Sequence, residues 1–148
     1  MPVLLHDPAV RQALRSRVEA LAPNSVRRWG KMSIDQMLWH INQSFEQALG
    51  RVGSQRVKEP LPAALMRIVV LNVPWPKGSP TAPELVADGA RHDFDVERAR
   101  CLELIDAFAA KSIDDSWPIS GSFGRMTGRD WSRLQAKHLD HHLRQFSA

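Results

Sequence analysis

Two histidines near the end of the chain, His138 and His142, are four residues apart in a stretch whose apolar residues recur at helical spacing. Residues i and i+4 lie one above the other on the surface of a helix, so the two rings can direct one nitrogen each at the same point. A divalent metal ion at that point would satisfy both nitrogens. The alternative is a histidine-rich helix end that faces solvent and complements the helix dipole.

The element that must position this pair is a helix predicted to begin after Thr127. Thr127 precedes Asp130 by three residues, which is close to a capping box. A buried neutral imidazole needs a partner for each ring nitrogen, so an inward face that changes from apolar to imidazole requires a reason. That face consists of Trp131, Leu134, His138, His142 and Gln145.

A third histidine, His40, falls within a second predicted helix. This helix should begin at Ser33, where Gln36 completes a capping box, and Gly50 should end it. His40 lies on or beside the apolar stripe, which reads Met37, His40 or Ile41, Ser44 or Phe45, and Ala48. Two interpretations remain open at this point: a core histidine with an ordinary hydrogen-bond partner, or a third metal ligand.

The rest of the chain predicts an all-α protein, an up-and-down four-helix bundle with a short extra helix and a Pro-rich loop, in one domain over residues 1–148. A first helix should start at Asp7 with Pro8 in its first position. A short apolar helix is expected within 60–73, with a strand as the alternative, and the Pro-rich loop occupies 74–83. A helix over about 96–110, opened by Asp93 or Asp95, should turn these residues inward: Ala99, Leu102, Ile105 or Asp106, and Phe108 or Ala109.

Composition excludes several classes of protein. The 43% of hydrophobic and 24% of charged residues are ordinary for a globular chain of 148 residues. The net charge of +4 comes from scattered arginines without a basic run, so nucleic-acid binding is not expected. The single cysteine, Cys101, excludes an internal disulfide and should be a buried inert thiol. The apolar N-terminal run is too short for a signal peptide and no apolar stretch could span a bilayer, so a cytoplasmic protein without membrane contact is expected.

Four segments of the sequence resemble the DinB-like (DinB/YfiT) superfamily of metal-dependent proteins, in an uncharacterised branch. The last of them is the most specific, and the resemblance runs from near residue 26 to the C-terminus. The segments read RWGKMSIDQMLWH at 28–40, WPKGSPT at 75–81, FGRMT at 123–127 and KHLDHHLRQF at 137–146.

This resemblance implies a four-helix bundle that holds one divalent metal through His40, His138 and His142. Zinc or nickel is expected, with manganese or iron as alternatives, and occupancy should fall below about pH 6, where free imidazoles protonate. His141 is then expected beside the ligands or at the surface. Relatives in this branch often have a His-Pro-x-Phe-Gly segment before the last helix, whereas this chain reads ISGSFG at 119–124, so a role for that additional histidine does not transfer.

Three hypotheses for function follow. The first is a metal-dependent enzyme, a thiol S-transferase or hydrolase acting on a small thiol conjugate, as the resemblance implies. The second is a non-catalytic, metal-stabilised ligand-binding or stress-associated bundle, and the third is a nucleic-acid or partner-binding module that uses the arginine-rich faces. The sequence names no catalytic base, although Gln36, Ser44 and Gln47 near His40 could orient a ligand. The apolar 60–73 segment and the five tryptophans also suggest a homodimer.

Overall fold

The described residues of the computed structural model, 2–53, 61–77 and 89–148, form five helices, with no strand beyond an isolated bridge between Ser120 and Gly124. The all-α prediction is therefore confirmed. Positions 78–83 of the predicted Pro-rich loop lie outside the described residues. The helices are α1 (Pro8–Glu19), α2 (Ile34–Ala48), α3 (Ala63–Asn72), α4 (Phe94–Ala110) and α5 (Gly128–Gln145).

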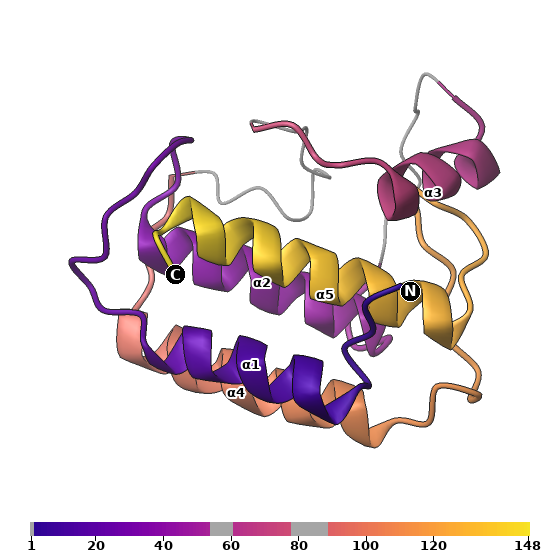
Figure 1. Ribbon diagram of the computed structural model, residues 1–148, viewed down its shortest axis with the longest axis horizontal. Coiled ribbons are helices and arrows are strands. Elements are labelled where there is room, and N and C mark those ends of the chain that lie inside the picture. Colours follow the sequence, from indigo (N-terminus) through magenta and orange to yellow (C-terminus); the bar gives the residue numbers. More distant parts are fainter. Residues whose placement is uncertain (1, 54–60, 78–88) are drawn as a thin grey trace.

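Four of these helices pack around one core. Each of α1 and α2 contacts both α4 and α5, so the order around the bundle is α1, α4, α2, α5, while α3 lies outside and contacts only α5 among the described helices (Figure 1). The up-and-down order of the helices stays a prediction. None of the described helices is both long and apolar enough to cross a membrane.

The helix starts follow from local capping chemistry. Asp7 Oδ1 accepts a hydrogen bond from the backbone N–H of Ala9 at 2.9 Å, with Pro8 as the first helical residue. Thr127 and Asp130 each accept from the other's backbone N–H at 3.1 Å, which completes the predicted capping box of α5. Helices α1, α2 and α5 thus begin where the sequence places them, and Asp93, one of the two residues predicted to open α4, is its N-cap. The first residues of α5 fix the register of His138 and His142.

The predicted inward face of α4 needs a correction. Ala99 is exposed and Leu102 is only half-buried, whereas the buried apolar positions are Cys101, Leu104, Ile105 and Phe108. Ile105 and Phe108 are thus buried as predicted, whereas Cys101 and Leu104 are buried where Ala99 and Leu102 were expected, because alanine fits either face of a helix and does not fix the register. Burial raises the pKa of the Cys101 thiol to about 12, which agrees with the expected inert cysteine.

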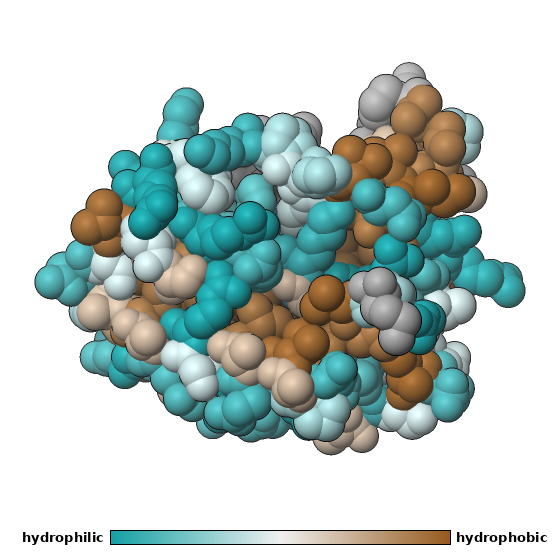
Figure 2. Space-filling model, in the orientation of Figure 1, coloured by the Kyte–Doolittle hydropathy of each residue, from teal (hydrophilic) through white to brown (hydrophobic). Residues whose placement is uncertain are grey.

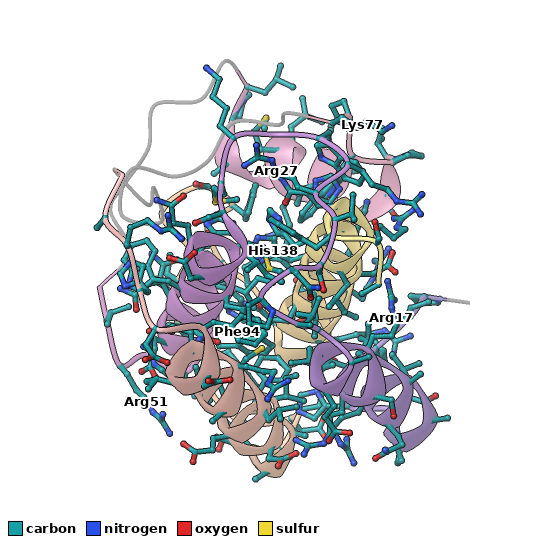
Figure 3. The ribbon with its side chains drawn as sticks, turned by 90° about the vertical axis from the view of Figure 1, so that its left-hand side faces the viewer. Arg17, Arg27, Arg51, Lys77, Phe94 and His138 are labelled. Carbon is teal, nitrogen blue, oxygen red and sulfur yellow. The ribbon has the colours of Figure 1, made fainter. Side chains whose placement is uncertain are left out.

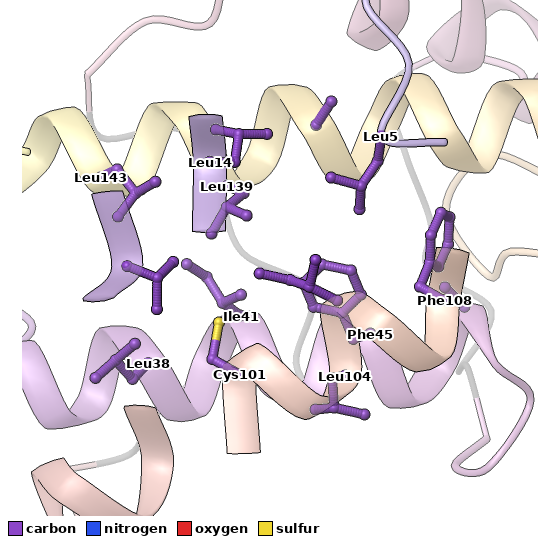
Figure 4. Close-up of a cluster of buried hydrophobic side chains, with 14 of the residues drawn as sticks. Leu5, Leu14, Leu38, Ile41, Phe45, Cys101, Leu104, Phe108, Leu139 and Leu143 are labelled. Carbon is purple, nitrogen blue, oxygen red and sulfur yellow. The ribbon is translucent and has the colours of Figure 1, made fainter. Parts of the chain in front are cut away.

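Apolar side chains of α2 and α5 pack together in the core. Ile41 and Phe45 of α2 and Leu139 and Leu143 of α5 are at most 1% exposed and meet around the Cys101 side chain (Figure 4). Burying one such side chain stabilises the fold by about 1.5–3 kcal/mol. His40 directly precedes Ile41, and each histidine of the α5 pair directly precedes one of the two leucines. Core packing therefore holds the three histidines at neighbouring levels of the bundle.

Helix α3 lies where the short apolar helix was predicted, so the alternative strand is excluded. Its outer face is exposed to solvent. Leu71 is its only buried residue, and Figure 2 shows a hydrophobic patch where Figure 1 places α3. Arg133 and Lys137 of α5 donate to the Leu71 and Val70 carbonyls at 3.0 and 2.8 Å, as cations at a helix C-terminus do. The exposed apolar side chains on and beside the helix are Leu61, Leu65, Ile68, Val69 and Val73.

Candidate metal centre

The structure brings His40 of α2 together with His138 and His142 of α5. One ring nitrogen of each residue lies within 4.8 Å of the other two. The rings are nearly perpendicular to one another, and every pair of centroids is separated by 4.7 or 4.8 Å. The side chains are only 3, 8 and 8% exposed, respectively. The structure therefore places His40 beside the α5 pair, as the interpretation of His40 as a third metal ligand requires.

The closest approach in this cluster joins two atoms of the same kind. His40 Nε2 lies 2.8 Å from His138 Nε2. Two neutral imidazoles can make this contact only if one of these nitrogens carries a proton and the other accepts it. A tetrahedral ion about 2.0–2.1 Å from each nitrogen would set its ligands roughly 3.3 Å apart, a spacing between 2.8 Å and the 4.8 Å limit of the group. The three residues therefore fit one small divalent ion.

Gln145 orients the third ring. His142 Nδ1 lies 2.8 Å from Gln145 Oε1, and Gln145 Nε2 donates to the Trp29 carbonyl at 2.9 Å. An amide oxygen only accepts hydrogen bonds, so His142 Nδ1 carries the proton and its Nε2 presents a lone pair. Gly30 permits this approach: it has φ +83°, and a Cβ there would lie 2.4 Å from Gln145 Nε2. Sequence reasoning placed Gln145 on this face without assigning it a role.

Burial keeps the cluster neutral. Desolvation lowers the pKa of His142 to about 3, with His40 adding to the effect and the Gln145 hydrogen bond opposing it. Desolvation, followed by the neighbouring histidines, holds the pKa of His138 well below its ordinary value. Neutral imidazole is the form that binds metals. The two α5 histidines are therefore held in the ligand form at neutral pH.

Two tryptophans cover the cluster. His141 is 9% exposed, so it is not a surface residue, and its ring lies 5.1 Å from that of His142. The Trp29 and Trp75 rings lie 5.7 and 5.5 Å from the His141 ring. The Trp75 ring is also 5.8 Å from that of His138, and its indole N–H donates to the Val70 carbonyl at 2.8 Å. The connector before α2 and the segment after α3 thus both reach the histidines.

The other polar candidates of α2 are engaged elsewhere. Gln36 accepts from the backbone N–H of Ser33 and donates to the Ala90 carbonyl, each at 2.9 Å. Ser44 Oγ and the Ser44 carbonyl contact the Gln135 amide nitrogen at 3.1 and 3.2 Å. Gln47 is buried farther along α2. Gln36 and Ser44 therefore hold neighbouring elements in place.

Comparison with known proteins agrees with this arrangement. The model of the DinB superfamily matches residues 8–146. The chain belongs to the DinB superfamily. No curated protein and no solved structure gives a significant match. Membership in a metal-associated superfamily and a buried group of three histidines on two helices together make a metal-binding site plausible.

Proposed function

We propose that this DinB superfamily protein holds one divalent metal through His40, His138 and His142 and uses it to transfer or hydrolyse small thiol conjugates. The observation that carries the proposal is the meeting of three buried imidazoles from two helices. Three protein ligands leave positions open to water or substrate, as in catalytic rather than structural zinc sites. Imidazole ligands suit zinc and nickel, and also iron, with manganese as a further alternative.

The bound metal would act as a Lewis acid that lowers the pKa of a coordinated water or thiol. The protein's own contribution is positional. Gln145 holds His142 with its Nε2 lone pair exposed to the ion, and the Trp29 and Trp75 rings limit access of water from the side of His141. A drier site strengthens the electrostatic effect of the metal on its ligands.

The test combines metal analysis with turnover. We expect the purified protein to contain about one zinc or nickel ion per chain, and the metal-loaded protein to cleave or transfer at least one member of a panel of thiol conjugates. Removal of the metal by a chelator should abolish turnover, and readdition should restore it. A protein that binds none of the four metals would overturn the proposal.

A second candidate, a metal-stabilised bundle without catalysis, is favoured by the low exposure of the three ligands, 3–8%. A ligand that binds only the folded state raises stability with its concentration. Under this alternative, metal raises the melting temperature while no conjugate in the panel is turned over. Turnover that depends on the metal excludes it.

We also propose that two copies of the chain pair through α3. Its outer face carries Leu65, Ile68 and Val69 exposed to solvent. The only charged side chain of the helix, Arg67, donates to the Arg125 carbonyl instead. An uncharged apolar face can meet its own copy across a two-fold axis without like-charge repulsion. Light scattering should report a dimer, and Leu65→Asp should yield a monomer that still binds metal; a wild-type monomer at all concentrations would contradict this.

A further inference from the structure

The cations of this protein fall into two groups according to their partners. One group has a carboxylate within ion-pair distance in the described residues, at 2.7–3.8 Å. Its members are Arg15, Arg17, Arg51, Arg91, Arg98, Arg100 and Arg144. The described residues provide no such partner for the other cations, which are Arg11, Arg27, Arg28, Lys31, Arg67, Lys77, Lys111, Arg125, Arg129, Arg133 and Lys137. Four members of this second group, Arg27, Arg28, Lys31 and Lys77, lie on the two segments that carry Trp29 and Trp75. We call these four residues the cationic rim.

The cationic rim follows from the sequence of two segments. No aspartate or glutamate occurs between Glu19 and Asp35, or within residues 61–77. These are the segments that supply Trp29 and Trp75, the two rings that cover the histidine cluster. These four cations, which have no carboxylate partner among the described residues, therefore lie on the elements that border the candidate metal centre. Figure 3 shows Arg27 and Lys77 on the same side of the bundle, above His138.

Lys77 is linked to the centre through ring contacts. Its ammonium nitrogen lies 5.0 Å from the centroid of the Trp29 ring, a cation–π distance. The Trp29 ring is 5.7 Å from the His141 ring, which is 5.1 Å from that of His142. Lys77 is exposed, so its charge is available to a ligand that extends outward from the centre.

Among the described residues, no carboxylate lies within ion-pair distance of the two arginines of the rim. Arg27 donates to the carbonyls of Lys31 and Met32 at 3.1 and 3.0 Å, which orders its guanidinium over the connector. Arg28 donates to Ser147 Oγ at 2.9 Å. Carbonyl and hydroxyl groups fix the position of a guanidinium without cancelling its charge. Prepositioned cations of this kind attract and orient an anionic ligand.

We propose that the cationic rim binds a carboxylate or phosphate group of the substrate whose sulfur lies at the three-histidine centre. This inference rests on the proposed function and specifies the substrate class as an anionic thiol conjugate. The reactive sulfur then lies at the histidine centre and the anionic group at Lys77, which contacts the Trp29 ring. Lys77 then determines specificity without contacting the reacting atoms.

The test measures direct binding to protein loaded with cobalt(II), where a bound thiolate gives a sulfur-to-metal absorption band. The probes are glutathione and its diethyl ester, which share the thiol but differ by two carboxylate charges. We expect glutathione to bind roughly tenfold more tightly at low ionic strength, from several exposed ion pairs of modest strength. Added salt should reduce this advantage.

Substitutions assign the effect to the rim. Lys77→Gln should weaken glutathione binding about two- to fivefold, and Lys77→Glu about tenfold, while both leave the ester unaffected. Arg129→Gln is the matched control, because Arg129 is an exposed cation without a carboxylate partner among the described residues, lies in the first turn of α5 outside the rim, and should change neither affinity.

Four outcomes decide the matter. Equal affinity for the acid and the ester overturns the inference, while metal binding by the three histidines stands. A Lys77→Glu variant that weakens both probes equally also overturns it, because the residue would then act only through packing on Trp29. Binding of neither thiol to the cobalt-loaded protein removes the thiol class and this inference with it. Failure to bind cobalt, zinc or nickel removes the proposed function itself.

Discussion

The two halves of α5 each face a histidine site, and the two sites differ in what their ring nitrogens contact. Near the start of the helix, Ser132 Oγ lies 2.9 Å from His6 Nδ1, and the Lys111 carbonyl lies 2.8 Å from His6 Nε2. Because a carbonyl only accepts, Nε2 carries the proton and Nδ1 accepts from the serine hydroxyl. Near the end of the helix, His138 Nε2 instead meets the nitrogen of another histidine, His40.

This difference separates a structural histidine from the proposed metal ligands. Both ring nitrogens of His6 have protein partners of opposite hydrogen-bonding type, so His6 needs nothing further and ties the N-terminal segment to α5. In the cluster, two nitrogens of the same kind face one another, and two neutral rings can satisfy the contact only if one nitrogen donates a proton to the lone pair of the other. A cation that accepts lone pairs from several sides suits this arrangement better than a proton does.

The largest expected effect comes from removing a ligand. Alanine in place of His40, His138 or His142 should lower metal affinity by more than about 100-fold, beyond the loss typical of residues that only support a ligand. His6→Ala and His141→Ala should retain the metal, as isothermal titration with zinc can measure. If His141→Ala abolished binding while His142→Ala did not, the proposed register of the site would be wrong.

A second effect concerns the stability of the metal-free protein at low pH. The unfolded chain protonates His142 below about pH 6.5, whereas its folded pKa is about 3. Below pH 6.5 the unfolded state therefore binds more protons, and the free energy of unfolding falls as pH decreases towards 3, by up to about 1.4 kcal/mol per pH unit for each such histidine.

The lowered pKa of His138 acts in the same direction. Urea unfolding at pH 7 and pH 5 should show the loss, and a His138→Gln and His142→Gln double variant should remove most of the difference. A pH-independent stability would contradict the lowered pKa values. The same shifts move the expected loss of metal to a lower pH than the value near 6 derived from free imidazole.

Substitution of His6 should lower the stability of the fold and leave metal affinity unchanged, whereas substitution of a proposed ligand should lower metal affinity. His6→Ala leaves the fully buried hydroxyl of Ser132 and the Lys111 carbonyl without their ring partners. We expect a loss of about 1–3 kcal/mol in the free energy of unfolding, measured by urea denaturation, with unchanged metal affinity. A metal-dependent loss of stability in this variant would mean that the two halves of α5 are coupled.

The comparison also explains what the sequence could predict. Spacing alone placed His138 and His142 on one face, and the capping signals fixed the starts of α2 and α5. The inward face of α4 was predicted correctly at Ile105 and Phe108 but not at Ala99, because an alanine does not indicate which side of a helix faces the core. Local periodicity could not reveal that His6 meets Ser132, 126 positions later, or that Trp29 and Trp75 converge on His141. These contacts depend on how connectors cross the bundle, which no helical pattern encodes.

The smallest expected effect separates the hydrogen bond that orients His142 from the one that holds the connector. Gln145→Leu removes both the acceptor for His142 Nδ1 and the donor to the Trp29 carbonyl, and should weaken metal binding about tenfold. Gln145→Glu keeps an acceptor for His142 but loses the amide donor. If orientation of the ring is what matters, the glutamate variant binds zinc at least as tightly as the wild type, because a carboxylate makes the ring a more basic ligand. If the tether to Trp29 matters instead, both variants lose the same affinity in isothermal titration, and the metal centre then depends on the connector rather than on the tautomer of His142.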